Sequence, residues 1–223
     1  MNRAERLEAA QRRAATYWLL SRLVLEAPTP VLLDELQAAL SASPCEAGEP
    51  LTVEVLHLLV AVDAARAGIP ADVDLRAEHT RIWSGLSETY GPPPPFESVF
   101  RERRLPGNAT AAVAAAYDAA GLDAAVADAG PPDHLASELR FMALCSMREA
   151  EAWAGGRDAQ ALEWADRQRE FLGEHLLAWA PGHCSKVADM AHTEYHRAVA
   201  NLVAGACRLD GAERGDAMDA CLA

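Results

Sequence analysis

Lysine is almost missing from this sequence, in which Lys186 is the only lysine among 20 basic residues. The 33 acidic residues outnumber the basic ones and give a formal net charge of −13. Most of such a surface would repel a phosphate backbone, so the composition argues against a nucleic-acid partner. The acidity would keep the protein in solution and would also attract a basic ligand such as an arginine-bearing peptide, and charge alone does not decide between these roles.

Long apolar runs, a signal peptide and paired cysteines are missing as well. The most apolar stretch, residues 53–65, carries charge and is shorter than the roughly 18 residues that a membrane span needs. The charged start of the chain lacks the apolar stretch and cleavage site of an export signal. The cysteines are odd in number and widely spaced, which suits a reducing compartment. We therefore expect a soluble, cytoplasmic protein that does not insert into membranes.

Sequence patterns of common catalytic sites are also absent. There is no glycine-rich phosphate loop after a strand, no G-x-S-x-G turn and no signature of a thiol enzyme. The sequence thus predicts neither an enzymatic activity nor a cofactor.

Apolar residues recur every three or four positions along most of the chain, which is typical of helices with one buried face. No segment has the period of two that a strand would show. The sequence predicts one all-α domain, residues 1–223, built as a bundle of roughly eight to ten helices, with two subdomains as an alternative. The expected helices cover residues 3–26, 29–40, 51–67, 72–86, 108–120, 133–154, 158–178 and 185–208.

Two segments interrupt this pattern. Residues 87–107 contain four consecutive prolines, 92–95, which cannot donate backbone hydrogen bonds, so we expect a long, hinge-like connection there. Pro181 and Gly182 should separate the last two helices. The acidic, glycine-broken tail, residues 209–223, is expected to be disordered.

A metal site is one interpretation of the C-terminal histidines. If His192 and His196 lie one helical turn apart, both side chains could face a metal together with His183 and Cys184. The spacing does not form an H-E-x-x-H motif, however, and histidines four residues apart on a helix are common. A metal-binding enzyme or sensor is therefore the alternative interpretation, and solvated or capping histidines are the simpler one.

Four blocks of the sequence resemble the ordered signature blocks of the TorD/NarJ-like chaperones of redox-enzyme maturation. They are LRAEHTRIWSGL (75–86), PPPPFESVFRE (92–102), PPDHLASELRFMALC (131–145) and FLGEHLLAWAPGHCSKV (171–187). Two positions depart from the family pattern, since Trp83 stands where a phenylalanine is usual and His183 stands where a bulky aromatic residue is usual.

The resemblance implies an all-α chaperone that binds the catalytic subunit of a molybdopterin-containing oxidoreductase. In that family the chaperone binds the twin-arginine signal peptide, delays export and keeps the apoenzyme open for cofactor insertion. Members can exchange helices between subunits, so the resemblance implies a monomer or a helix-swapped dimer.

The resemblance also implies a peptide-binding region in three of the blocks. The residues concerned are Trp83, Gly85, Tyr90, Phe96, Glu97, Pro132, Asp133, His134 and Glu138. Asp133 could pair with a peptide arginine and His134 could make binding sensitive to pH near neutrality, while Asp133 could also simply cap the helix that begins there. Trp83 has a mixed set of helical neighbours, so partial exposure and burial in the core are both open.

Overall fold

The computed structural model describes residues 1–42, 50–69, 73–84 and 91–222, with side chains described up to Arg214. Helices make up nearly all of this part of the chain, and the predicted all-α bundle is confirmed. In chain order the elements are α1 (Arg3–Leu25), α2 (Pro30–Ala42), α3 (Thr52–Arg66), α4 (Leu75–Trp83), α5 (Glu97–Glu102), α6 (Asn108–Ala120), α7 (Asp123–Val126), a 3-10 turn (Ala127–Ala129), α8 (Leu135–Ala154), α9 (Asp158–Phe171), a π-turn (Leu172–Leu176), α10 (Leu177–Met190) and α11 (Glu194–Leu222).

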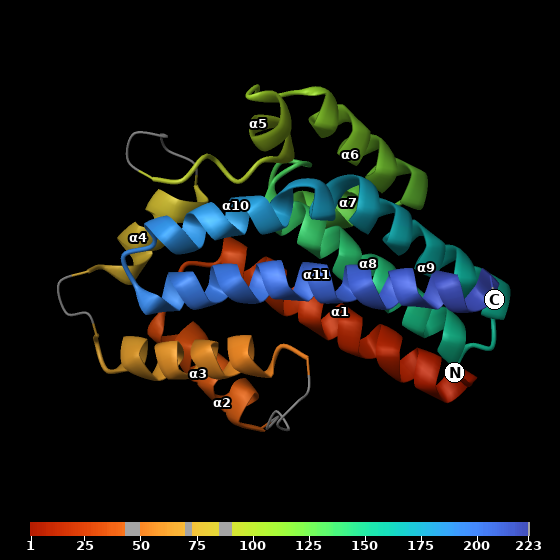
Figure 1. Ribbon diagram of the computed structural model, residues 1–223, viewed down its shortest axis with the longest axis horizontal. Helices are drawn as coiled ribbons and strands as arrows, with labels where there is room; N and C mark the ends of the chain where they lie inside the picture. Colours follow the sequence, from red (N-terminus) through yellow and green to blue (C-terminus); the bar gives the residue numbers. More distant parts are fainter. Residues whose placement is uncertain (43–49, 70–72, 85–90, 223) are drawn as a thin grey trace.

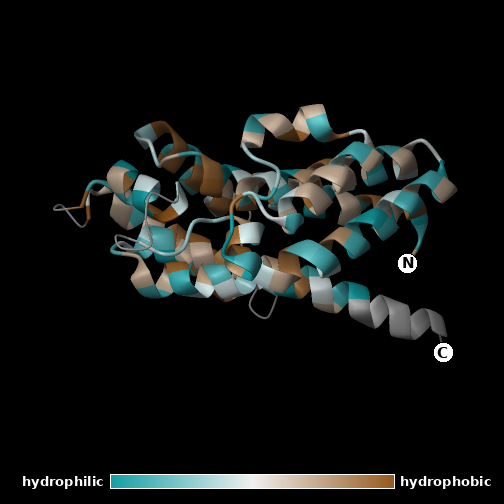
Figure 2. Cartoon of the chain, turned by 90° about the horizontal axis from the view of Figure 1, so that it is seen from above, coloured by the Kyte–Doolittle hydropathy of each residue, from teal (hydrophilic) through white to brown (hydrophobic). Residues whose placement is uncertain are grey.

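The long helices pack side by side around one apolar core. Helix α1 lies along α8, α8 along α9, and α10 along α11, while α2 and α3 cover one side and α5 and α6 another (Figure 1). Hydrophilic and hydrophobic residues alternate along the helices in Figure 2, as expected when each helix buries one face. The core runs continuously from Tyr17 to Cys207 and includes residues from both sides of the Pro-rich connection.

Local sequence signals set several helix ends. At the start of α1, Asn2 Oδ1 accepts from the Glu5 amide at 3.0 Å and a Glu5 carboxylate oxygen accepts from the Asn2 amide at 2.8 Å. This reciprocal pair satisfies two amides that the first turn leaves free. At the end of α6, Gly121 has φ +64°, a conformation that glycine adopts without steric cost.

The Pro-rich connection is shorter than predicted. Residues 91–96 are not helical, but α5 follows at once, so the expected uninterrupted connection over residues 87–107 is wrong in its second half. Residues 87–90 lie outside the described part of the chain. The helix at α5 is stabilised by contacts with the start of α8, described below, which the local sequence does not reveal.

Pro181 does not end a helix. It lies within α10, and the chain breaks instead between Met190 and Glu194. Proline removes one backbone hydrogen bond from a helix, and packing over a long helix can compensate for that loss. Because Trp179, Cys184 and other residues of α10 are buried on both sides of the proline, tertiary contacts hold the helix together.

The tail expected to be disordered continues α11 as a helix to Leu222. Tyr17 donates to Asp210 Oδ2 at 2.7 Å, and Arg214 donates to Asp210 Oδ1 at 2.8 Å. A Cβ atom at Gly211 would lie 2.8 Å from the side chain of Leu177, so this glycine permits close contact between α11 and α10. Disorder is therefore wrong for the part of the tail up to Arg214, where Asp210, Gly211 and Arg214 make tertiary contacts.

Candidate functional site

The Pro-rich connection lies directly against the start of α8. Phe96 and His134 form an antiparallel bridge pair, and the Glu97 amide donates to the Asp133 carbonyl at 2.9 Å. The Phe96 ring also packs edge-to-face against the His134 ring, with centroids 5.1 Å apart. The structure therefore brings together two of the sequence blocks that were predicted to share a binding region.

His134, and not Asp133, caps the N-terminus of α8. The His134 Nδ1 atom accepts from the Ala136 amide at 3.1 Å, whereas Asp133 Oδ2 accepts from the Ser98 amide in the first turn of α5 at 3.1 Å. The interpretation of Asp133 as the cap of the helix that follows it is wrong, because the bridge to the connection directs this carboxylate towards α5. Asp133 thus joins α5 to the turn before α8.

Three carboxylates are fully buried at this junction: those of Glu97, Asp133 and Glu138. Glu97 forms an ion pair with Arg101, and its other oxygen lies 2.9 Å from Nδ1 of His175. Buried carboxylates are costly unless they are paired, so only Glu97 has its charge compensated directly.

Glu138 is the least compensated member of this group. Burial and the neighbouring carboxylates of Glu97 and Asp133 raise the pKa of Glu138 well above its ordinary value, although Trp179 Nε1 donates to Glu138 Oε2 at 3.0 Å. Asp133 Oδ1 and Glu138 Oε1 have no hydrogen-bond partner among the described residues. Unpaired buried polar atoms and perturbed carboxyl groups are typical of functional sites.

His134 is buried, and its expected sensitivity to pH near neutrality stays a prediction. Burial lowers its pKa below the ordinary value, more than the Trp83 carbonyl and the Asp133 carboxylate raise it. His134 Nε2 lies 3.3 Å from the Trp83 carbonyl. Burial therefore favours the neutral imidazole, which contacts the Ala136 amide and the Trp83 carbonyl.

The remaining predicted residues have different environments. Trp83 is 2% exposed, so its interpretation as a core residue is confirmed and partial exposure is wrong. Pro132 is half-buried, and its carbonyl accepts from the Tyr117 hydroxyl at 2.8 Å. Gly85 and Tyr90 lie outside the described residues.

The four residues of the metal interpretation do not converge. His183 and Cys184 are buried on α10, His196 is buried on α11, and His192 is exposed in the segment before α11, where its Nδ1 atom lies 3.3 Å from Glu78. His192 and His196 therefore do not lie on consecutive turns of one helix. Burial lowers the pKa of His183 to about 3 and raises that of Cys184 to about 12. In the part of the chain that is described, no three His, Cys, Asp or Glu residues are placed to hold a metal.

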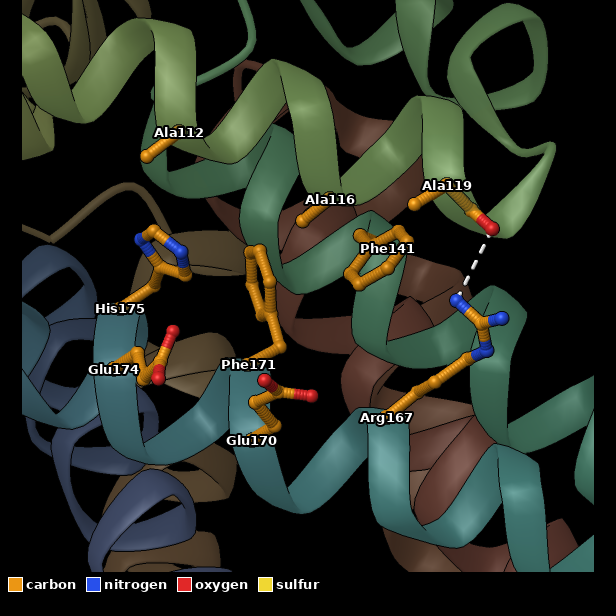
Figure 3. A pocket seen from close by; sticks show the side chains of 9 residues that line it. All are labelled: Ala112, Ala116, Ala119, Phe141, Arg167, Glu170, Phe171, Glu174 and His175. Atoms are coloured by element: carbon orange, nitrogen blue, oxygen red, sulfur yellow. Dashed lines mark hydrogen bonds between the residues drawn. The ribbon is translucent and has the colours of Figure 1, made fainter.

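A pocket of about 250 Å³ opens beside the buried carboxylates, between α6 and the junction of α9 with α10 (Figure 3). Phe141, Phe171 and His175 form its inner part, three alanines of α6 form one wall, and charged residues of α9 and the π-turn form its rim. We call it the α6 pocket, and its lining consists of Ala112, Ala116, Ala119, Phe141, Arg167, Glu170, Phe171, Glu174 and His175.

The π-turn shapes the α6 pocket. It extends from Leu172 to Leu176 and so carries both Glu174 and His175. Such turns frequently occur at functional sites, because the additional residue changes the direction of the side chains around it. His175 reaches inward from the pocket to Glu97, so the pocket is directly connected to the buried carboxylates.

The sequence analysis missed this pocket because an uninterrupted helix was expected over residues 158–178. Two signals were present in the sequence. Arg167, Glu170 and Glu174 recur at helical spacing beside Phe171, and three alanines recur with the same spacing over residues 112–119. Neither signal alone distinguishes a pocket from an ordinary solvated helix face.

None of the described helices is long and apolar enough to span a membrane. No solved structure matches the chain significantly. Two curated proteins do match part of it. The chain is 39% identical over 74 residues to a selenate reductase assembly chaperone protein from Thauera selenatis and 35% identical over 74 residues to a chlorate reductase assembly chaperone protein from Ideonella dechloratans.

Each of these matches covers 32% of this chain and 37% of the relative, so the chain spans little more than a third of the length of these relatives. The family described as "Nitrate reductase delta subunit" matches residues 50–185, which is more than half of the chain and includes the bridge between the connection and α8, the α6 pocket and the π-turn. The chain therefore belongs to the nitrate reductase delta subunit family, in agreement with the TorD/NarJ-like resemblance of its sequence blocks.

Proposed function

We propose that this protein is an assembly chaperone for the catalytic subunit of a molybdopterin-containing oxidoreductase, and not itself an enzyme. The observation that carries the proposal is the family match over residues 50–185, together with two relatives whose names describe assembly chaperones of reductases.

We further propose that the chaperone acts in the cytoplasm on the apo form of its client and binds the client's twin-arginine signal peptide, which delays export until the cofactor is inserted. The net charge of −13 supports a basic ligand. Contact between the peptide and the sequence-predicted residues stays a prediction. Asp133 and Glu138 are fully buried, so the elements around them would have to move before either could meet a peptide arginine.

Calorimetric titration of the full chain tests the peptide part of this proposal. The probe is a synthetic signal peptide with two consecutive arginines, taken from the molybdoenzyme encoded beside this chain. We expect saturable binding with a Kd in the micromolar range, which corresponds to a binding free energy of about −8 kcal/mol. A twin-lysine peptide is expected to bind more weakly, because a guanidinium pairs with a carboxylate through two parallel hydrogen bonds and an ammonium does not.

The mature catalytic subunit without its cofactor provides the control for the chaperone role. If it forms a complex with this chain when the signal peptide has been removed, assembly and peptide binding are separate activities. If neither the peptide nor the apo subunit binds at tens of micromolar, the proposed function is wrong.

A further inference from the structure

The carboxylates at the rim of the α6 pocket have no cationic partner among the residues that the structure describes. Glu170 and Glu174 are exposed, and in the described structure neither side chain forms an ion pair. Arg167, the one cation in the lining, donates to the carbonyl of Ala119 at the end of α6 at 3.1 Å (Figure 3). Arg101 lies nearby, but it pairs with Glu97 and donates to the backbone carbonyl of Glu174. The two carboxylates are therefore available to a cation from outside.

The interior of the same pocket is aromatic. The rings of Phe141 and Phe171 have centroids 4.6 Å apart, and in Figure 3 the Phe171 ring stands between His175 and Phe141, with Glu170 below it. Ala112 and Ala116 leave the opposite wall open, since neither side chain is large enough to fill it. A space of about 250 Å³ exceeds the cavities of about 150 Å³ that admit a benzene molecule, so one large side chain fits.

This combination of groups matches one ligand chemistry. A guanidinium forms bidentate hydrogen bonds with carboxylates and also stacks on aromatic rings, and its methylene stem packs on apolar surface. Burying an isolated apolar side chain would not use the carboxylates, and a carboxylate ligand would be repelled by them. An arginine next to an apolar residue uses both parts of the pocket.

We propose that the α6 pocket binds one arginine of an apolar, arginine-bearing segment of the client, with Glu170 and Glu174 holding the guanidinium and Phe171 holding its stem or the neighbouring apolar side chain. This inference rests on the proposed function, and it assigns the contact to an exposed pocket instead of the buried Asp133. His175 lines the pocket and contacts Glu97 at the start of α5. A ligand in the pocket would therefore be linked through His175 to the junction of α5 and α8.

Titration of variants with the same twin-arginine peptide tests the assignment. We expect Glu170→Gln/Glu174→Gln to weaken binding about tenfold, the combined effect of two partly exposed ion pairs, and to make binding less sensitive to salt. Ala116→Leu should also weaken binding, because it fills the pocket without changing the charge. Asp133→Asn tests the buried site separately, because it removes that charge and leaves the lining of the α6 pocket unchanged.

A double variant with the same change in net charge serves as the control. Asp189→Asn/Glu213→Gln removes two exposed carboxylates outside the pocket and should bind like the wild type. If the wild type binds the peptide and both pocket variants bind equally well, the assignment to the α6 pocket is overturned while the proposed function stands. A weaker affinity for Asp133→Asn alone would return the contact to the buried site, and no binding by the wild type would remove peptide recognition altogether.

Discussion

Glu138 lies in the core with one carboxylate oxygen bonded to Trp179 and the other without a partner in the described structure. Its pKa is raised, so the folded protein binds a proton here more tightly than the unfolded chain does. This proton adds to the free energy of unfolding. The contribution is fully present below the pKa that Glu138 has in the unfolded chain, and it is lost as the pH rises. At neutral pH the residue is therefore a source of instability that the fold tolerates.

Glu138→Gln should consequently stabilise the protein at pH 7 to 8. The glutamine can still accept from Trp179 and carries no charge, so we expect the free energy of unfolding to rise by about 1–2 kcal/mol, the usual cost of an incompletely satisfied buried group. The difference from the wild type should shrink towards pH 4. Urea denaturation at both pH values measures it, with the exposed Glu163→Gln as the control. Equal stability of the variant and the wild type at pH 8 would contradict the raised pKa.

The sequence blocks predicted which residues lie together at this site, but they did not predict the burial or the hydrogen bonds of these residues. Phe96, Glu97, Asp133 and His134 do lie together, as their resemblance to the chaperone family implied. Their burial could not be predicted, because a polar residue after a proline-rich segment reads as exposed unless its tertiary partners are known. For the same reason the sequence did not reveal that His134 caps α8 while Asp133 accepts from Ser98 of α5.

At the scale of elements, the part of α11 around Asp210 and Arg214 is held by a chain of polar contacts between four helices. Asp210 accepts from Tyr17 of α1, Arg214 donates to Gln168 of α9 at 3.0 Å, and Gln168 in turn donates to Glu149 of α8 at 2.8 Å. Networks of buried polar groups stabilise a structure only while all their members are satisfied. The end of α11 should therefore be sensitive to the loss of a single group.

Tyr17→Phe provides the test for this contact. The variant leaves Asp210 Oδ2 without its donor, so we expect a loss of about 1–3 kcal/mol in the free energy of unfolding and faster proteolysis near the end of α11. Glu213→Gln, on the same part of α11 but exposed, should leave both unchanged. Wild-type stability of Tyr17→Phe would show that the network does not hold the helix.

Helices with a clear apolar face were predicted correctly, because that signal lies within one segment. The continuation of α10 through Pro181 and of α11 beyond Arg208 was missed, because both depend on contacts with other helices. The π-turn was missed because one additional residue hardly alters a pattern that repeats every three or four positions.

At the scale of the whole molecule, buried histidines should govern the response to acid. His79, His183 and His196 are all buried, and desolvation lowers their pKa values to about 4, about 3 and about 3. Burial of the neutral histidines is compatible with full stability above the pKa of histidine in the unfolded chain. This stability is lost as the pH falls from there through the lower pKa values of the folded protein. Glu138 acts in the opposite direction, but it is one group against three.

We therefore expect the free energy of unfolding to fall by roughly 4 kcal/mol between pH 6.5 and pH 5, a large part of the stability of a typical domain. Denaturation curves at pH 7, 6 and 5 measure this slope. His183→Leu, which has no hydrogen bond to lose in the described structure, should reduce the slope, while replacement of the exposed His57 by Gln should not. A wild type equally stable at pH 7 and pH 5 would contradict the assigned neutral histidines.

The π-turn gives this molecule a feature that can be followed across its relatives. One residue rotates an α-helix by about 100°, so the additional residue between α9 and α10 determines which face α10 presents to α11 and where Glu174 and His175 point. Gly173 has no neighbouring atom within 4 Å of the position of a Cβ, so a residue with a side chain could stand here without a steric clash at that atom. We expect a homologue that lacks one residue here to have a regular helix and no α6 pocket. The number of residues between α9 and α10 therefore distinguishes relatives that can share the binding specificity of this pocket from those that cannot.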